Sequence, residues 1–333
     1  MNNYGIFTIS IDLELAWGVC DRPIKPSTRH KILLERDIVR SILNLFSKYD
    51  IRATWAIVGH LFLTECNWEG DKVHPEISRP ITKNLKRDWF FQHPKNHADP
   101  LWYSCDIIEW IRNASPKQEI GSHSFCHIKY CERSTNPKAV KADIKRAKKL
   151  HEAFNLPFEA FIFPHNIVGY KSLLAKAGVL VYRGNSPIWY NFIPSYSIRC
   201  LLDSIYFLIR VPSPTVMAMV DETGMVNIPE SMLLSGRNGV RSLVSSRRTI
   251  KRGIDGLNRA VERGEIFHLW FHPYNFTNKK DKQFYVLEAF LKYAQRLREN
   301  GQLEILTMRD IQRKTVETKF KKNNKNIQNV KRS

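Results

Sequence analysis

The chain has 333 residues, 43% of them hydrophobic and 25% charged, which excludes a mainly disordered, collagen-like or coiled-coil protein. Its 52 Lys and Arg against 32 Asp and Glu give a formal net charge of +20, which favours anionic partners such as nucleic acid, phosphorylated sugars or acidic lipid headgroups. No apolar run approaches the ~18–20 residues of a membrane-spanning helix, and the N-terminus lacks a secretory-signal pattern. We therefore expect a cytoplasmic protein, which its charge could bring to the inner face of the membrane.

Strand-like and helix-like patterns alternate along the chain. Strands are predicted at 6–12, 52–59, 119–124, 158–164, 179–184, 266–273 and 303–308, and helices at 31–49, 106–113, 138–154, 171–177, 247–263 and 281–298. Residues 67–100 read as a long polar and aromatic loop, and residues 186–235 as an irregular insertion with several prolines. The alternation predicts parallel βαβ units, either closed into a barrel or arranged as a doubly wound sheet.

The end of the chain differs in composition from the body. Residues 313–333 hold eight basic residues and one acid, Glu317, and they have few apolar side chains. Such a composition is typical of disordered segments. We therefore predict one domain over residues 1–315 and a disordered basic tail over residues 316–333.

The cysteines give no motif. Six of them lie far apart and include no CxxC pair, so in a chain without an export signal we expect reduced thiols. The same spacing excludes a zinc ribbon. The one local pair, Cys126 and Cys131, is best explained by small buried side chains.

Polar side chains follow four of the predicted strands, at the point where each strand ends. These groups are Asp12 with Glu14, His123 with His127, Pro164 with His165 and Asn166, and His272 with Pro273. In a parallel barrel the C-terminal strand ends meet on one face, which is where active sites lie. We therefore expect these four groups to form one site.

The first two groups contain metal-ligand side chains. Asp12 and Glu14 are two residues apart in an extended segment, so their carboxylates point the same way and repel unless a cation or a proton intervenes. His123 and His127 have the i, i+4 spacing that many metal sites use. Alone, the acid pair is as well explained by solvated acids, and the histidine pair is better explained by paired surface or buried histidines. Together they fit a two-His, one-carboxylate site with open positions for water and substrate.

The strand at 266–273 offers two histidines. His268 and His272 are an even number of residues apart and share a strand face, but only His272 stands at the strand end. We therefore predict that His272 is reactive and that His268 packs in the core.

Together these blocks resemble the polysaccharide deacetylase family, also called the NodB-homology or carbohydrate esterase 4 family. The matching pieces are SIDLELAWG (10–18), EIGSHSFCH (119–127), FIFPHNIVGY (161–170) and FHLWFHP (267–273), which occur in the family's order. The strings DxExxWG, FPxN, YRGN and HxWFHP are most similar to a branch found in bacterial surface-glycan gene clusters. The resemblance covers most of the body of the chain.

The resemblance implies a distorted (β/α) barrel that binds one divalent metal, usually zinc, with cobalt, nickel or manganese as alternatives. It also implies removal of an acyl group, most simply acetyl, from an N-acyl sugar of a cell-surface glycan or its precursor. By the family's motif order Asp12 would be the general base, Glu14, His123 and His127 the metal ligands, and His272 the general acid.

Two features depart from the family pattern. The metal acid is most often Asp, so Glu14 is a longer substitute and its role and that of Asp12 could be exchanged. The third motif usually carries an Arg near its Pro, whereas here Phe163 precedes Pro164. We consider Arg183, in YRGN, as the source of the missing positive charge.

The group of Pro164, His165 and Asn166 is expected to contact the substrate. Backbone N–H groups near His165 and Asn166 could complete an oxyanion hole for the tetrahedral intermediate of amide hydrolysis. Pro164, His165, Asn166 and Arg183 are accordingly the predicted substrate and oxyanion residues.

A basic segment precedes the strand that carries His272. Residues 235–253 contain Arg237, Arg241, Arg247, Arg248, Lys251 and Arg252 and no acid. We predict anion binding at Arg247 and Arg248, with a sugar-linked phosphate or an acidic membrane lipid as partner and without nucleic acid.

Two alternatives stay open from the residues alone. One is a carbohydrate- or anion-binding protein that has lost catalysis on the same scaffold. The other is a glycosidase that uses Asp12 and Glu14, which ranks last because acids two residues apart on one strand do not easily flank a glycosidic bond.

Overall fold

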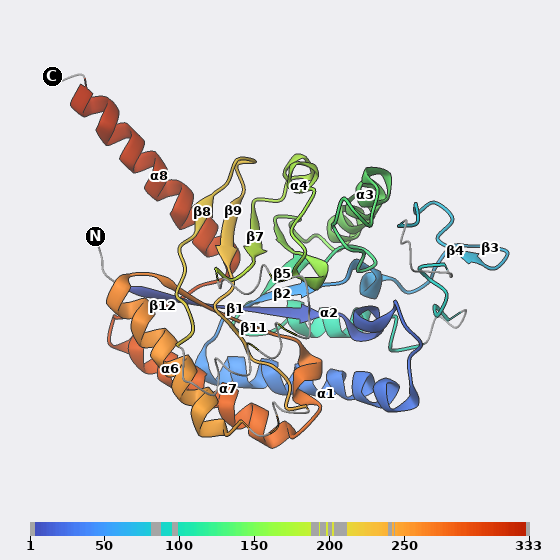
Figure 1. The fold of residues 1–333 in the computed structure, drawn as a ribbon, viewed down its shortest axis with the longest axis horizontal. Coiled ribbons are helices and arrows are strands. Elements are labelled where there is room, and N and C mark those ends of the chain that lie inside the picture. Colours follow the sequence, from blue (N-terminus) through green and yellow to red (C-terminus); the bar gives the residue numbers. More distant parts are fainter. Residues whose placement is uncertain are drawn as a thin grey trace.

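A computed structural model of the chain describes residues 4–80, 88–94, 99–187, 212–238 and 244–330 and the single positions 193, 198, 202 and 242, with side chains described as far as residue 320. The described part contains one large sheet in the order β10-β11-β1-β2-β5-β6-β7-β9-β8, with β12 paired to β1. The sheet is curled into part of a barrel (Figure 1). Within it every strand pair is parallel except β8 with β9.

The strands follow the predicted order. Their bounds are β1 Gly5–Leu13, β2 Thr54–Ile57, β5 Glu119–Ser122, β6 Ala160–Ile162, β7 Val181–Gly184, β8 Met219–Val220, β9 Val226–Pro229, β10 Met232–Leu233, β11 Ile266–Phe271 and β12 Leu303–Ile305. The central strands β1, β2 and β11 are buried along almost their whole length, as expected for parallel strands covered on both faces. A small separate hairpin pairs β3 (Trp68–Glu69) with β4 (Lys72–Val73).

Helices cover the sheet because each has one apolar face. They are α1 Pro26–Tyr49, α2 Cys105–Arg112, α3 Pro137–Ala153, α4 Lys171–Ala177, α6 Ser246–Arg263, α7 Lys280–Glu299 and α8 Met308–Val330. Helices α1, α6 and α7 lie together on one side of the sheet (Figure 1). In α1, Ile38, Ile42 and Phe46 recur at helical spacing and are fully or almost fully buried. No helix in the described ranges is long and apolar enough to cross a membrane.

The segment predicted to be an irregular insertion contributes to the barrel. In its described part, β9 pairs in parallel with β7, and β10 pairs in parallel with β11, so residues 226–233 extend the sheet at both ends of its strand order. The strands were not predicted because they are only two and four residues long and Pro229 lies at the end of β9. Residues 188–192, 203–211 and other positions of that prediction lie outside the described residues.

The end of the chain also differs from the prediction. Helix α8 continues to Val330, so residues 316–330 are helical where the composition predicted disorder. Met308 and Ile311 are buried in the first turn, which fixes the start of the helix against β7, β8 and β9. No Pro or Gly follows them before Val330, so the two strongest helix breakers are absent from this stretch. The helix projects away from the body (Figure 1).

Candidate active site and metal centre

The sheet register brings the predicted site residues to one edge. Leu13 lies opposite Ile57, which lies opposite Ser122, and Ile11 lies opposite Phe271. The next residues of those strands therefore emerge side by side at the C-terminal edge of the sheet. This is the physical reason why Glu14, His123 and His272, distant in sequence, share one site.

Glu14 is the meeting point of two imidazoles. Its Oε1 lies 3.1 Å from Nε2 of His123 and 3.0 Å from Nε2 of His127. All three residues are buried. His127 reaches this position because the chain between the two histidines turns back, with φ of 66° at Ser124 and 59° at His127, and the Ser124 hydroxyl accepts the His127 N–H. The predicted ligand set is therefore brought together.

The hydrogen bonding around His123 fits a cation at this point. Its Nδ1 lies 2.9 Å from the carbonyl oxygen of Ile162, which can only accept, so Nδ1 carries the proton. In a neutral ring Nε2 then presents a lone pair to Oε1 of Glu14, itself an acceptor. Such a contact is stable only with a proton or a metal ion between the atoms. The backbone carbonyl behind the ring is also the usual orienting partner of a metal-bound histidine.

Asp12 lies beside this cluster and has a different partner. Its two oxygens accept bonds of 2.8 and 2.7 Å from the two terminal nitrogens of Arg183, a bidentate pair that is almost completely buried. Burial opposes ionisation of Asp12, but the Arg183 guanidinium and the nearby His123 and His272 outweigh it, so the pKa of Asp12 is lowered. Arg183, on β7, thus brings to the site the positive charge that the third motif does not supply.

Arg183 is itself held from several sides. It also donates to the Ser10 hydroxyl at 3.0 Å and to Oδ1 of Asn166 at 2.8 Å, and its guanidinium lies 4.2 Å from the centre of the Trp270 ring. Residue types and spacing alone did not reveal Ser10 and Trp270. The available signal for Ser10 was its position two residues before Asp12, on the same face of β1.

His268 supports this arrangement from within the core. Its Nε2 lies 2.9 Å from the Ser10 hydroxyl and its Nδ1 3.2 Å from the carbonyl oxygen of Pro229. Burial, and then the nearby Arg183 charge, lower the pKa of His268 to about 3, so the ring is neutral. His268 is therefore a buried packing residue, as its position within the strand predicted.

His272 stands at the mouth of the site. Its Nε2 lies 3.3 Å from Oε1 of Glu14 and 3.7 Å from Oδ2 of Asp12, and its side chain is 13% exposed. Burial favours the neutral ring, but the carboxylates of Glu14 and Asp12 outweigh it and raise the pKa of His272. Burial also opposes ionisation of Glu14, but the imidazoles of His127, His272 and His123 outweigh it and hold the pKa of Glu14 well below its usual range. The backbone N–H of His272 is fixed by Oδ1 of Asn275 at 2.9 Å.

The third predicted group, Pro164 with His165 and Asn166, provides only part of what was expected of it. Pro164–Asn166 forms a single 3-10 turn after β6, and the His165 ring lies 4.7 Å from the His127 ring. The backbone N–H of Asn166 donates to the carbonyl of Phe163 at 3.0 Å, which removes it from the expected oxyanion hole. The N–H of His165 is the remaining backbone candidate in this turn. The Asn166 side chain instead contacts Arg183.

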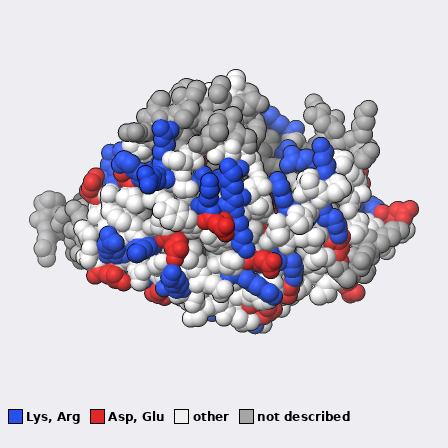
Figure 2. Space-filling model, turned by 90° about the horizontal axis from the view of Figure 1, so that it is seen from below, with Lys and Arg blue, Asp and Glu red and all other residues white. Residues whose placement is uncertain are grey.

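The basic segment divides between structural and exposed residues. Arg237 is buried and donates to Gln283, to the Val244 carbonyl and to the Ser246 hydroxyl, so it is part of the packing. Arg247 and Arg248 are exposed in the first turn of α6. Lys and Arg are spread over the face that carries α1, α6 and α7, with acidic residues between them (Figure 2). The basic residues of this face are therefore spread among acidic ones and do not form a single patch.

Comparisons with known proteins identify the fold. No protein-family model and no curated protein matches the sequence. Among solved structures, the chain is similar to a protein from Mycobacterium smegmatis assigned as a polysaccharide deacetylase, with a TM-score of 0.60, 13% identity and coverage of 94% of this chain and 91% of that one. It is also similar to Puue allantoinase, with a TM-score of 0.60, 13% identity and coverage of 93% and 90%.

A third similar structure comes from Pseudomonas aeruginosa PAO1 and is also assigned as a polysaccharide deacetylase, with a TM-score of 0.57, 12% identity and coverage of 93% and 91%. The chain therefore has the NodB-homology fold, the distorted (β/α) barrel of polysaccharide deacetylase structures, as one domain. The predicted fold class is confirmed.

Proposed function

We propose that the protein is a metal-dependent hydrolase that removes an N-acyl group, most simply acetyl, from a sugar. The observation that carries this proposal is the meeting of Glu14, His123 and His127 at one oxygen atom, beside the Asp12–Arg183 pair and His272. An open two-His, one-carboxylate set with a base and an acid next to it is an arrangement that can hydrolyse an amide.

Glu14, His123 and His127 would hold the metal. The contacts support Glu14 over Asp12 as the ligand, because Glu14 faces both imidazoles whereas both oxygens of Asp12 are bonded to Arg183. When bound, a divalent ion, with zinc as the expected one, supplies Lewis-acid activation of water and of the amide carbonyl.

Asp12 is the proposed proton acceptor. The bidentate Arg183 contact fixes its orientation and keeps it ionised at neutral pH. An ionised carboxylate at the edge of the site can take the proton of the attacking water as the C–O bond forms.

His272 is the proposed proton donor. The carboxylates of Glu14 and Asp12 raise the pKa of His272, which favours the protonated ring that a proton donor needs. As the C–N bond breaks, the departing amine nitrogen takes a proton from Nε2, and the products are a free amino sugar and a carboxylate. His165 and its backbone N–H, next to the proposed ligand His127, are proposed to contact the acyl oxygen.

The sugar is proposed to belong to a cell-surface glycan or its precursor, on the motif resemblance noted above. A phosphate on that substrate would find Arg247 and Arg248 exposed at the start of α6. This end of α6 lies toward the carboxyl end of β11, because α6 connects to β11 by a short turn and runs antiparallel to it. We further propose that the protein acts in the cytoplasm, with acidic lipid at the inner membrane face as a peripheral partner.

The test is a substrate panel. Zinc-loaded protein is incubated with nucleotide-linked, lipid-linked and free N-acetyl sugars, and mass spectrometry follows the loss of one acetyl group. Deacetylation by the wild type and its absence in Asp12→Asn support the proposal. Binding of the same sugars without loss of acetyl would instead support a binding protein on this scaffold.

A further inference from the structure

A second cluster of metal-ligand side chains lies behind the active site. His60 is in the turn Gly59–Phe62 after β2, Cys66 and His74 flank the β3–β4 hairpin, and His93 follows in the same long loop. The three histidines are buried and Cys66 is partly buried. None of these residues takes part in the proposed hydrolysis.

The side chains converge through the atoms that bind metals. Nε2 of His60 lies 3.1 Å from Nε2 of His74 and 3.0 Å from Nε2 of His93. Sγ of Cys66 lies 3.2 Å from Nε2 of His60 and 3.7 Å from Nε2 of His93. For a regular tetrahedron around zinc, with Zn–N of about 2.0–2.1 Å and Zn–S of about 2.3 Å, the edges are about 3.3 Å for N–N and about 3.6 Å for N–S. The observed contacts scatter around these values.

Two of the rings are oriented by their other nitrogen. Nδ1 of His60 lies 3.2 Å from the carbonyl oxygen of Trp102, and Nδ1 of His74 lies 3.4 Å from a carboxylate oxygen of Glu76. Both partners are acceptors, so both Nδ1 atoms carry the proton and both Nε2 atoms present lone pairs to each other. Lone pairs at 3.1 Å repel unless a cation lies between them. Protonation of one ring would also relieve this repulsion, but burial opposes it, because a buried imidazolium loses its solvation.

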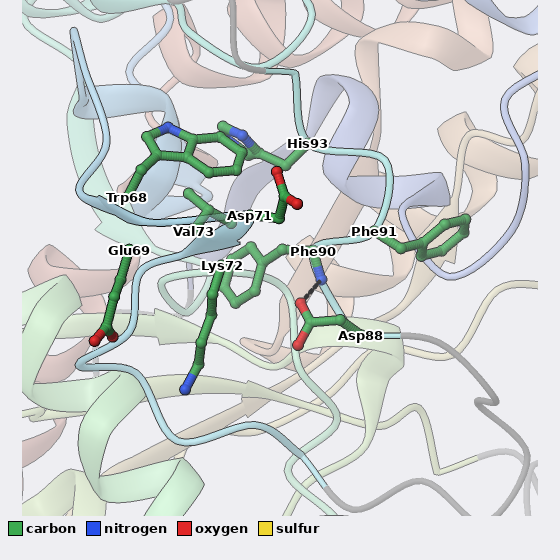
Figure 3. A pocket seen from close by; sticks show the side chains of 9 residues that line it. All are labelled: Trp68, Glu69, Asp71, Lys72, Val73, Asp88, Phe90, Phe91 and His93. Atoms are coloured by element: carbon green, nitrogen blue, oxygen red, sulfur yellow. Dashed lines mark hydrogen bonds between the residues drawn. The ribbon is translucent and has the colours of Figure 1, made fainter.

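The donor set narrows the choice of ion. Thiolate and imidazole are ligand types of closed zinc sites and of other transition metals, whereas calcium and magnesium prefer oxygen ligands. Zinc is the ion that we propose. The carbonyl and carboxylate behind His60 and His74 are the second-shell partners that zinc-bound histidines usually have. A pocket next to the hairpin reaches His93 and offers an entry path (Figure 3). Trp68 and Phe90 line the same pocket.

The cluster contacts the loops that carry the active-site ligands. The backbone N–H groups of Gly59 and His60 donate to the carbonyls of Ser124 and Phe125, both at 2.8 Å. The Phe125 ring packs against His60 and His74, with ring centres 5.6 and 5.3 Å apart. Trp17, three residues after Glu14, packs on His60 at 4.6 Å. An ion here would brace the turn between His123 and His127.

We propose that His60, Cys66, His74 and His93 bind a structural zinc ion that fixes the described parts of the long loop, residues 63–80 and 88–94, against the back of the active site. The inference is independent of the proposed hydrolysis, because it concerns a different set of ligands.

The experiment is a metal analysis of the full chain, which needs no substrate. Zinc-reconstituted wild type should hold two equivalents of zinc per chain, and His127→Ala should keep one. Cys66→Ser should lose one equivalent. Cys131→Ser, a control at another partly buried cysteine, should lose none.

Cobalt(II) substitution provides the second measurement. A thiolate-to-cobalt charge-transfer band should appear in the wild type and in His127→Ala and should be absent in Cys66→Ser. The His127→Ala spectrum decides the question even if Cys66→Ser fails to fold, because that change lies outside the cluster. A band in His127→Ala supports the second centre even when no sugar is deacetylated. A wild type with one equivalent and no charge-transfer band would overturn it while leaving the proposed function intact.

Discussion

The two histidine clusters of this protein are built from similar contacts but differ in their surroundings. In the first, His123 and His127 meet a carboxylate, Glu14, at the ends of barrel strands. In the second, three imidazoles meet a thiol, and the ligands come mainly from one long loop. In both clusters, short distances join atoms that can bind a metal ion. The neighbours of each cluster separate a centre built for chemistry from one built for structure.

A carboxylate and an imidazole suited to proton transfer lie beside the first cluster. Asp12 and His272 border Glu14, and their pKa values are shifted apart, downward for Asp12 and upward for His272. The second cluster is enclosed by aromatic rings, including Trp17 and Phe125. A metal with an open coordination position is useful at the first centre, whereas the second uses its positions for protein ligands.

The largest effect is expected at a ligand of the first cluster. His127→Ala should reduce deacetylation to background and remove one equivalent of metal, because two remaining protein ligands hold a divalent ion poorly. Acetate release and zinc content measure the two effects. His165→Ala, whose ring packs on His127, is the matched control and should keep full metal content. Full metal content in His127→Ala would contradict the ligand assignment.

The next effect separates the two acids of the first cluster. Asp12→Asn keeps the shape of the side chain and loses the proton acceptor, so kcat should fall about 10²–10⁴-fold with metal retained. Glu14→Gln should instead lose the metal, since Glu14 faces both imidazoles. Parallel measurement of kcat and zinc content tests the pair. The reverse pattern would show that the two roles are exchanged.

A smaller effect is expected from the partner of Asp12. Arg183 lowers the pKa of Asp12, so Arg183→Gln should raise that pKa and move the acidic limb of the kcat/KM profile to higher pH. The activity at neutral pH should fall about 10–100-fold, as for other residues that orient a catalytic group. In Arg183→Lys the acidic limb should lie between its positions in the wild type and in Arg183→Gln. An unshifted limb in Arg183→Gln would mean that Asp12 does not set it.

The smallest effect concerns the exposed arginines of α6. Arg247→Gln with Arg248→Gln should raise KM a few-fold for a phosphate-bearing N-acetyl sugar and leave KM for a sugar without phosphate unchanged. Lys251→Gln serves as the control, because Lys251 is exposed on the same helix but is paired with Asp255. Equal loss on both sugars would assign the two arginines to structure rather than to phosphate recognition.

Local patterns predicted parallel βαβ units and the residues of the first cluster, and the family resemblance selected the barrel among the possible arrangements. Alternating apolar residues located β1 within one residue at each end, and helical spacing located α4 at Lys171–Ala177. Strand-end polar residues located Glu14, His123 and His272, since parallel register aligns strand ends. Arg183 was identified only as a candidate, because its pairing with Asp12 depends on the curl of the sheet from β1 to β7.

The remaining features depend on contacts that spacing does not encode. The strands β9 and β10 are too short for periodicity to detect, and the helical extension of α8 depends on its buried first turn. The second cluster has the spacing H-x5-C-x7-H-x18-H, which matches no common metal motif. Its one sequence signal was the concentration of His and Trp in a loop too long to be a simple connection.

The central claim is that an ion held by Glu14, His123 and His127 is required for amide hydrolysis. The most direct measurement titrates zinc into chelator-treated protein and follows acetate release from the N-acetyl sugar that the substrate panel identifies. In the wild type, activity should return in proportion to zinc until the centre is full, and in His127→Ala it should not return at any zinc concentration. Recovery of acetate release in His127→Ala, or wild-type activity that survives complete zinc removal, would contradict the account.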